Sequence, residues 1–277
     1  MIETIRNAWK IPELRKKILF TVFALLIFRL GSVVPVPFID SNMLGATLNN
    51  MGGIFTLLGA MNGTAFSMAA VFALGVQPYI NSSIIIQLLT VAIPALERLQ
   101  KEGGEEGRKK IAAITRYVTV AIGLLQGFGY YTLIRTQGGG TMLDTAGLPG
   151  WWAGIVIVLC FTAGSAFVMW LGEQINQKGI GNGISILLFA GIVARLPDTV
   201  NILVKALGAA WESPDSFGQY YFFVPLFVII FLAIIWVIVF MNDAERRIPV
   251  QYAKRVVGRK MYGGQSTHLP IKVNMSG

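Results

Sequence analysis

Long apolar segments alternate with short charged segments along this chain. No charged residue occurs between Asp40 and Glu97, and an uncharged stretch of this length is typical of a region embedded in a bilayer or in a very large core. Six segments are predicted to span a membrane, with bounds 18–36, 67–96, 111–134, 152–171, 184–208 and 220–241. The pattern therefore predicts an all-α protein that crosses a membrane several times.

One part of the uncharged stretch is too short to span. Only about eight residues lie between Ile54 and Met61 before Asn62-Gly63 interrupts the pattern, whereas a membrane helix needs about 20. Irregular backbone at membrane depth is tolerated only where protein or a water-filled cavity surrounds it. We therefore expect a cavity beside the segment 54–66, and we expect the function to lie in that cavity.

Both ends of the chain are polar and basic. Residues 1–17 are predicted to form an amphipathic helix in the headgroup region, because Ile2, Ile5 and Trp9 fall on one helical face. Residues 242–277 are predicted to form a cytoplasmic loop with a β-hairpin, because strand-like segments flank several glycines. Arg259 and Lys260 would then lie near the tip of this hairpin.

Composition and charge agree with a membrane protein of defined orientation. Only 13% of the residues are charged, against about a quarter in soluble domains, and the net charge is +9. If six helices cross, the loops rich in Lys and Arg all lie on one side, which the positive-inside rule assigns to the cytoplasm. Both ends of the chain are therefore expected to be cytoplasmic.

The sequence contains no motif typical of an enzyme or a metal site. His268 is the only histidine and Cys160 the only cysteine, and both occur alone. The glycine-rich run 179–183 lacks the preceding strand and the following Lys that a phosphate-binding loop requires, so it is interpreted as a tight turn into the next helix. We expect no catalysis, no cofactor and no metal.

Several short motifs occur in a fixed order along the chain. They are FRLG at 28–31 with PVP at 35–37, ALGVQPYI at 73–80, SIIIQLL at 83–89, WLGEQ at 170–174, GIGNGIS at 179–185, YAKR at 252–255 and QSTHLP at 265–270. Together, and in this order, they resemble the SecY family, the central subunits of the bacterial protein-conducting channel. The resemblance implies a SecY-type helical bundle with a short re-entrant plug.

The resemblance implies an aliphatic pore ring made by two helices. Val76 and Ile80 are four residues apart and share a helix face, as do Ile184 and Leu188. In the SecY family these positions contribute to the ring. Branched aliphatic side chains can close a pore by dewetting, and they offer no hydrogen bonds that would trap a passing peptide.

The resemblance also implies a plug, a lateral gate and a contact surface for partners. The implied plug residues are Ile54, Phe55, Leu57, Leu58, Met61 and Phe66. The implied lateral-gate residues are Asn81, Ile84, Ile85 and Gln126. The residues implied to contact ribosomal RNA or the SecA motor are Lys254, Arg255, Arg259 and Lys260.

The implied function is that of the channel-forming subunit of the Sec translocon in the bacterial plasma membrane. Such a subunit passes unfolded polypeptides across the membrane and releases transmembrane segments laterally into lipid. The implied partners are SecE, SecG, the SecA motor, the ribosome with its RNA, signal peptides, nascent polypeptides and membrane lipids. The family has ten spans, so a chain with six is expected to be a fragment or to be completed by a companion chain, and we favour a fragment.

The alternative function is secondary transport of a small solute. Transporters also use broken helices with a site near the bilayer midplane, and that site is usually built from charged or polar ligands. The segment 75–89 offers only Gln77, Asn81 and Gln87 among aliphatic residues. This composition favours a peptide pore over a solute site.

Overall fold

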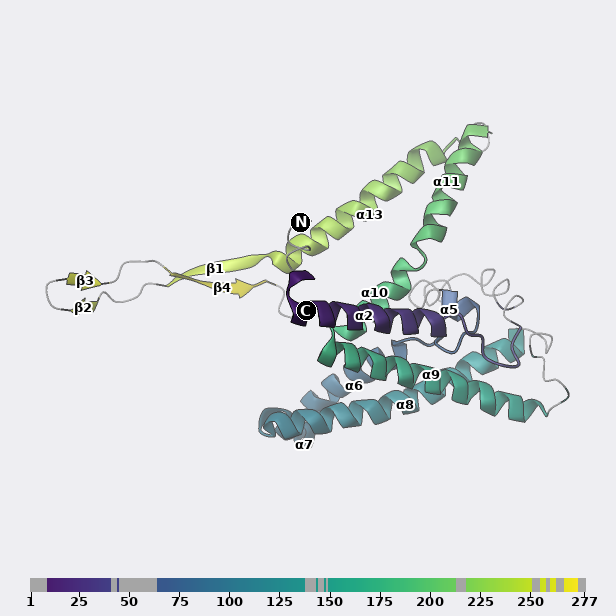
Figure 1. Cartoon of the computed structure of the whole chain (residues 1–277), viewed down its shortest axis with the longest axis horizontal. Helices are drawn as coiled ribbons and strands as arrows, with labels where there is room; N and C mark the ends of the chain where they lie inside the picture. The colour runs from purple at the N-terminus through teal and green to yellow at the C-terminus, as the bar shows by residue number, and fades with distance from the viewer. Residues whose placement is uncertain are drawn as a thin grey trace. The chain divides into compact units, whose positions relative to one another are not determined.

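The structure is a computed structural model that describes residues 9–40, 44, 64–137, 143, 147, 149–212, 218–250, 255–257, 260–262 and 267–273. Most of the described residues are helical, and short β-strands occur near the C-terminus (Figure 1). The chain divides into two compact units, Met1–Pro197 and Asp198–Gly277. Each unit is described below by itself.

The first unit is a bundle of helices packed around α9 (Gly150–Lys178). This helix contacts α2 (Pro12–Gly31), α6 (Gln77–Ala92), α8 (Gly104–Gln137) and α10 (Gly183–Val193) (Figure 1). Half of the most apolar part of α9 is buried, as expected for a helix that is apolar all round and surrounded by others. The short helices are α5 (Thr64–Ser67) and α7 (Pro94–Lys101).

The first predicted span differs from the helix that forms. The helix α2 begins at Pro12, where a proline is favoured because the first helical N–H groups have no partner in the helix. It therefore includes the basic residues at 15–17, which the sequence assigned to a separate interfacial helix 1–17. The first eight residues of that predicted helix lie outside the described part. The helix ends at Gly31, and residues 32–36 continue without helical structure toward Pro37.

The second predicted span, 67–96, does not form a single helix. Residues 68–76 form successive turns, and only Gln77–Ala92 is helical. The chain then bends by 101° into α7. The bend falls at Ile93, which is extended because the ring of the following Pro94 disfavours helical backbone at the preceding residue.

The turn segment 68–76 lies inside the first unit. Its backbone is satisfied by the residues that follow α2: Val36 N–H donates to the Ala69 oxygen at 3.0 Å, and Val71 N–H donates to the Val34 oxygen at 2.9 Å. Gly164 of α9 makes room for it, because a Cβ at Gly164 would lie 2.0 Å from the Val71 carbonyl oxygen. Most of this irregular segment, among the described residues, is thus enclosed by protein, as membrane depth requires, although Met68 is exposed.

The predicted fifth span, 184–208, forms as two helices. The helix α10 ends at Val193, and α11 (Leu196–Glu212) begins after Ala194 and Arg195. The boundary between the two compact units falls inside α11, after Pro197. The break coincides with the interruption of the apolar pattern at Arg195 and Pro197.

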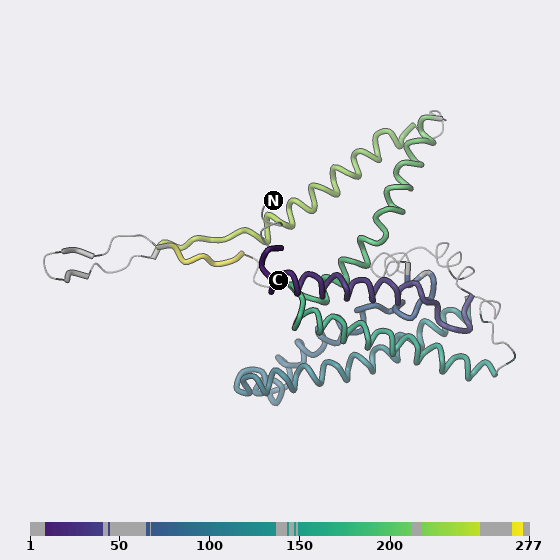
Figure 2. Tube along the Cα trace, viewed as in Figure 1, coloured from purple at the N-terminus to yellow at the C-terminus, as the bar shows by residue number. Residues whose placement is uncertain are grey.

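The second unit consists of most of α11, the helix α13 (Tyr220–Asp243) and a β-hairpin. Strand β1 (Glu245–Val250) pairs antiparallel with β4 (Thr267–Lys272), and the two segments run side by side in the chain trace (Figure 2). Ile248 lies opposite Leu269 in this pair. Strand β2 (Arg255–Val257) pairs with β3 (Lys260–Tyr262). The predicted hairpin is therefore present, but it consists of two short ladders rather than one.

Among the described residues, four helical segments are long and apolar enough to cross a membrane. They are α8, α9, the α10–α11 pair and α13, and the bent pair α6–α7 would make a fifth. The helix α2 is not among them, and it carries four basic residues, at 15–17 and 29. The count of six spans therefore stays a prediction, in which α2 would place its basic residues near the headgroups.

Candidate functional site

The four predicted ring residues belong to one apolar cluster in the first unit. Val76 is buried in this cluster, and Ile80, Ile184 and Leu188 are partly buried and pack against it. Two come from α6 and its cap, and two come from α10. The cluster is backed by buried residues of the surrounding elements, among them Phe28, Phe72, Val168, Leu171 and Ile175. The structure thus brings together residues separated by about a hundred positions in the sequence.

The turn before α6 sets the position of Val76. Gly75 has a φ of 51°, in the left-handed region that glycine adopts without strain. Val76 then caps the helix, and Ile80 N–H donates to the Val76 oxygen at 3.1 Å. Val76 and Ile80 therefore stack one turn apart on the same face, as the spacing predicted.

The turn before α10 is equally well defined. Gly181 has a φ of 68°, and the Asn182 side chain accepts hydrogen bonds from the backbone N–H groups of Ile184 and Ser185 at 3.1 and 3.4 Å. Gly183 N–H donates to Asn176 Oδ1 of α9 at 2.7 Å. The interpretation of 179–183 as a tight turn is confirmed, and its Asn serves as the helix N-cap.

Glycines let α10 approach α9 beside Ile184, a predicted ring residue. A Cβ at Gly183 would lie 2.1 Å from the Gly172 carbonyl oxygen, and a Cβ at Gly172 would lie 2.4 Å from Ile184 Cδ1. The Ile184 side chain therefore lies directly over Gly172. The two glycines fix how far the α10 half of the ring can project from α9.

The predicted gate residues lie on two helices that pack together, α6 and α8. Ile84 and Ile85 of α6 are exposed, at 50% and 43%. Asn81 of α6 and Gln126 of α8 are half-buried, and within the described part of the chain no hydrogen bond joins them. Gln126 Oε1 is buried and has no hydrogen-bond partner among the described residues, which is costly in an apolar surrounding.

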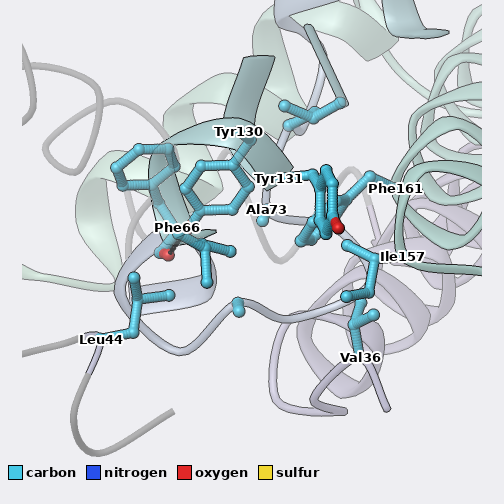
Figure 3. Close-up of a cluster of buried hydrophobic side chains, with 11 residues drawn as sticks. Val36, Leu44, Phe66, Ala73, Tyr130, Tyr131, Ile157 and Phe161 are labelled. Atoms are coloured by element: carbon cyan, nitrogen blue, oxygen red, sulfur yellow. Dashed lines mark hydrogen bonds between the residues drawn. The ribbon is translucent and has the colours of Figure 1, made fainter. Parts of the chain in front are cut away.

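Only one predicted plug residue, Phe66, is among the described residues. Its ring stacks on Tyr130 of α8 with the centroids 4.8 Å apart, and Tyr130 Oη donates to the Phe66 carbonyl oxygen (Figure 3). Tyr130 in turn packs against Phe161 of α9. The other five predicted plug residues, at positions 54, 55, 57, 58 and 61, lie outside the described residues.

Two polar links between helices were not predicted. Arg116 Nε of α8 donates to Glu173 Oε1 of α9 at 2.8 Å, and the hydroxyls of Ser82 on α6 and Thr119 on α8 lie 2.5 Å apart. Arg116 falls inside the predicted third span, 111–134, which α8 extends back to Gly104. The signals available were a charge within the predicted third span, Arg116, and a charge just beyond the predicted fourth span, Glu173.

The predicted contact residues of the basic hairpin are only partly described. Arg255 pairs with Tyr262, and Lys260 pairs with Val257, in the β2–β3 ladder. Lys254 and Arg259 lie outside the described residues. Across the described ranges, no group of three or more His, Cys, Asp or Glu is placed to hold a metal ion.

Comparison with known proteins identifies the family. The SecY family model matches residues 70–277. The protein translocase subunit SecY of Streptomyces coelicolor is 41% identical over 287 residues, covering 100% of this chain and 63% of that protein. The corresponding subunit of Escherichia coli K12 is 43% identical over 269 residues, covering 96% of this chain and 58% of that protein. The chain therefore spans less than two thirds of the length of these relatives.

Solved structures show the same fold. A structure described as "The structure of a protein conducting channel" matches with a TM-score of 0.55 and 20% identity, over 97% of this chain and 57% of its own. Sec61 in a canine ribosome-channel complex from the endoplasmic reticulum matches with a TM-score of 0.53 and 19% identity, over 89% of this chain and 54% of its own. The predicted all-α SecY-type bundle is thereby confirmed. With a family model over most of its length and relatives above 40% identity, this multi-pass membrane chain belongs to the SecY family.

Proposed function

We propose that this chain forms the ring-bearing part of a protein-conducting channel, which passes unfolded polypeptides and releases apolar segments sideways into lipid. The observation that carries the proposal is the convergence of Val76, Ile80, Ile184 and Leu188 in one apolar cluster. These side chains are positioned by two defined helix starts, at Gly75 and at Asn182. This arrangement supports the proposal of a narrow apolar constriction held on defined backbone.

The proposed mechanism is passive gating. A constriction lined by Val, Ile and Leu excludes water and ions while it is narrow, because dewetting closes an apolar pore. A polypeptide enters by displacing the side chains through rotamer changes, and it meets no hydrogen-bonding group that would hold it. The exposed side chains of Ile84 and Ile85 provide the apolar surface against which a signal peptide helix would pack at the lateral gate.

The proposed partners follow from family membership. They are SecE, SecG, the SecA motor and the ribosome, and the canine Sec61 structure comes from a ribosome-channel complex. The basic hairpin residues Lys254, Arg255, Arg259 and Lys260 are proposed to provide the contact with ribosomal RNA or SecA. The phosphates of RNA attract such a cluster of basic side chains.

We place this chain in the bacterial plasma membrane with both ends cytoplasmic. The support is the clustering of Lys and Arg in alternate connections. Single cysteines at Gly139 and Gly264, in a chain that lacks Cys160, should then react with an impermeant thiol reagent from opposite sides of the membrane. Reaction of both cysteines from the same side would contradict the six-span topology, and reaction of the Gly264 position from the periplasmic side would contradict the orientation.

The proposed function is tested by asking whether a hybrid that contains this chain can replace the native SecY subunit in cells. The chain is joined to the part of the E. coli SecY subunit that lies beyond the aligned stretch, and the hybrid is expressed in cells depleted of their own SecY. Growth and export of a secreted reporter protein are expected. A hybrid that accumulates in the membrane with SecE, at the level of the native subunit, yet exports no reporter would contradict the proposal.

A further inference from the structure

A groove runs along the outside of the α8–α9 hairpin, near the connection between the two helices. Its cavity volume is about 430 Å³. One wall is formed by Leu124 and Phe128 of α8, and the other by Ile155 and Leu159 of α9. All four side chains are exposed. None of them belongs to the predicted ring, plug or gate.

The floor of the groove is a close contact between α8 and α9. Tyr131 of α8 is buried and lies over Gly154 of α9, where an added Cβ would come within 2.8 Å of the tyrosine ring. Tyr131 Oη donates to the Gly150 carbonyl oxygen at 3.3 Å. Deeper in the hairpin, a Cβ at Gly127 would meet the Val158 carbonyl oxygen at 3.3 Å, so the helices are held together by small residues.

The groove is apolar along its length and charged at one end. Arg135 is its only charged lining residue, and it lies in the last turn of α8 beside Trp151 in the first turn of α9. Leu124 and Arg135 are eleven residues apart, which is about 16 Å along a helix. This is close to half of the ~30 Å hydrocarbon thickness. Trp and Arg are also the residues that favour the membrane–water interface.

These features match one phospholipid of the adjacent leaflet. An acyl chain would lie over the Tyr131 floor, between the aliphatic and aromatic walls. The headgroup phosphate would reach the Arg135 guanidinium, whose planar donors suit phosphate oxygens. We propose that the α8–α9 groove is a binding site for an anionic phospholipid, with one acyl chain in the groove and the phosphate on Arg135. The chain would bind this lipid whether or not it conducts polypeptides.

The test uses the 277-residue chain in nanodiscs of phosphatidylcholine that contain a minor fraction of phosphatidylglycerol with a photoreactive acyl chain. After illumination, labelled peptides are mapped by mass spectrometry. The expected result is strong labelling of the α8 and α9 peptides that line the groove, above the labelling of exposed residues of α13. A phosphatidylcholine probe with the same photoreactive chain should label the groove less.

Two variants and one control test where the headgroup and the acyl chain of the lipid bind. Arg135→Gln should lower groove labelling by about fivefold, as expected for one charge-assisted hydrogen bond at an exposed site. Ile155→Trp should lower it by filling the groove. Arg108→Gln, which removes one positive charge near the other end of α8, should leave it unchanged.

Three results would overturn the proposal. The first is equal labelling by the two probes. The second is groove labelling that does not respond to Arg135→Gln while the variant keeps its helical circular dichroism. The third is crosslinking of the groove to a second copy of the chain in place of lipid, which would show that a protein helix occupies it.

Discussion

The hydroxyl oxygens of Ser82 on α6 and Thr119 on α8 lie 2.5 Å apart, and both side chains are buried. Each hydroxyl has a single proton and also lies within hydrogen-bond distance of a carbonyl oxygen of its own helix, Tyr79 for Ser82 and Thr115 for Thr119. One of the two hydroxyls therefore donates to the other across the helices, while the other can donate to its own carbonyl. This bond ties α6, which carries part of the predicted ring, to α8 next to Asn81, a predicted gate residue. A hydrogen bond between two helices can break and re-form without leaving a packing defect. Such a bond suits the proposed lateral gate, where α6 would have to move.

We predict that Ser82→Ala weakens the packing of α6 on α8. Interhelical hydrogen bonds in membrane proteins contribute about 0.6 kcal/mol on average and seldom more than about 1.7, so the loss should be of that size. The measurement is unfolding of the chain in mixed micelles by denaturant. Ser83→Ala is the matched control, because this neighbouring hydroxyl makes no hydrogen bond within the described part of the chain. Equal losses for both variants would show that the Ser82–Thr119 link contributes nothing specific.

The Arg116–Glu173 ion pair should couple α8 to α9 more strongly than an exposed pair couples two turns of one helix. Glu173 is only 18% exposed, whereas both members of the Lys101–Glu97 pair are well exposed. Double-mutant cycles with Arg116→Gln and Glu173→Gln should give a coupling of about 1 kcal/mol, after allowance for the half-exposed arginine. The same cycle at Lys101 and Glu97 should give a smaller coupling, because solvent screens the exposed pair. Coupling free energies of equal size would show that the burial of Glu173 does not strengthen its ion pair.

Gly183→Ala should displace α10 from α9. The added methyl group would meet the backbone oxygen of Gly172 at 2.1 Å, and backbone cannot rotate away as a side chain can. A loss of about 1–3 kcal/mol in unfolding free energy is expected, as for other overpacked contacts. Gly129→Ala on α8 is the control, because nothing lies within 4 Å of its added Cβ, and it should be neutral or stabilising.

The basic hairpin should contribute to partner binding through charge. Neutralising Arg255, Arg259 and Lys260 together in the replacement hybrid should weaken its binding to ribosomes or SecA without changing insertion. If RNA phosphates are the target, the slope of log affinity against log salt should become shallower, because fewer counterions are released. Affinity is measured across a salt series. Unchanged affinity and slope with both partners would leave these residues a role in topology alone.

Continuous apolar segments were predictable, and breaks were visible only where the apolar pattern itself is interrupted, as at Arg195 and Pro197. The predicted spans 152–171 and 220–241 correspond to α9 and α13, because nothing interrupts their pattern. The helix within the predicted span 67–96 is shorter than the span at both ends, because Gly75 and Pro94 act on the local backbone while the composition remains apolar. Apolar composition alone therefore located the region but not the helix.

The candidate site shows the same limit. Spacing placed Val76 with Ile80 and Ile184 with Leu188, but only the family resemblance joined the two pairs. The Ser82–Thr119 and Arg116–Glu173 links join residues 37 and 57 positions apart. Such pairings depend on how whole helices pack, and no local pattern in one sequence specifies them. The α8–α9 groove likewise depends on the contact between Tyr131 and Gly154.

The central claim is that the four aliphatic ring residues, Val76, Ile80, Ile184 and Leu188, gate the pore, and ion conductance tests it most directly. The replacement hybrid is reconstituted in planar bilayers with Ile80→Asn or Ile184→Asn. The controls are Leu88→Asn on α6 and Ile192→Asn on α10, which make a comparable change at exposed positions outside the cluster. The account predicts a raised resting ion conductance for both ring variants, because a polar side chain wets the constriction, and parent-like conductance for both controls. Parent-like conductance for both ring variants, in channels that still export the reporter, would contradict it.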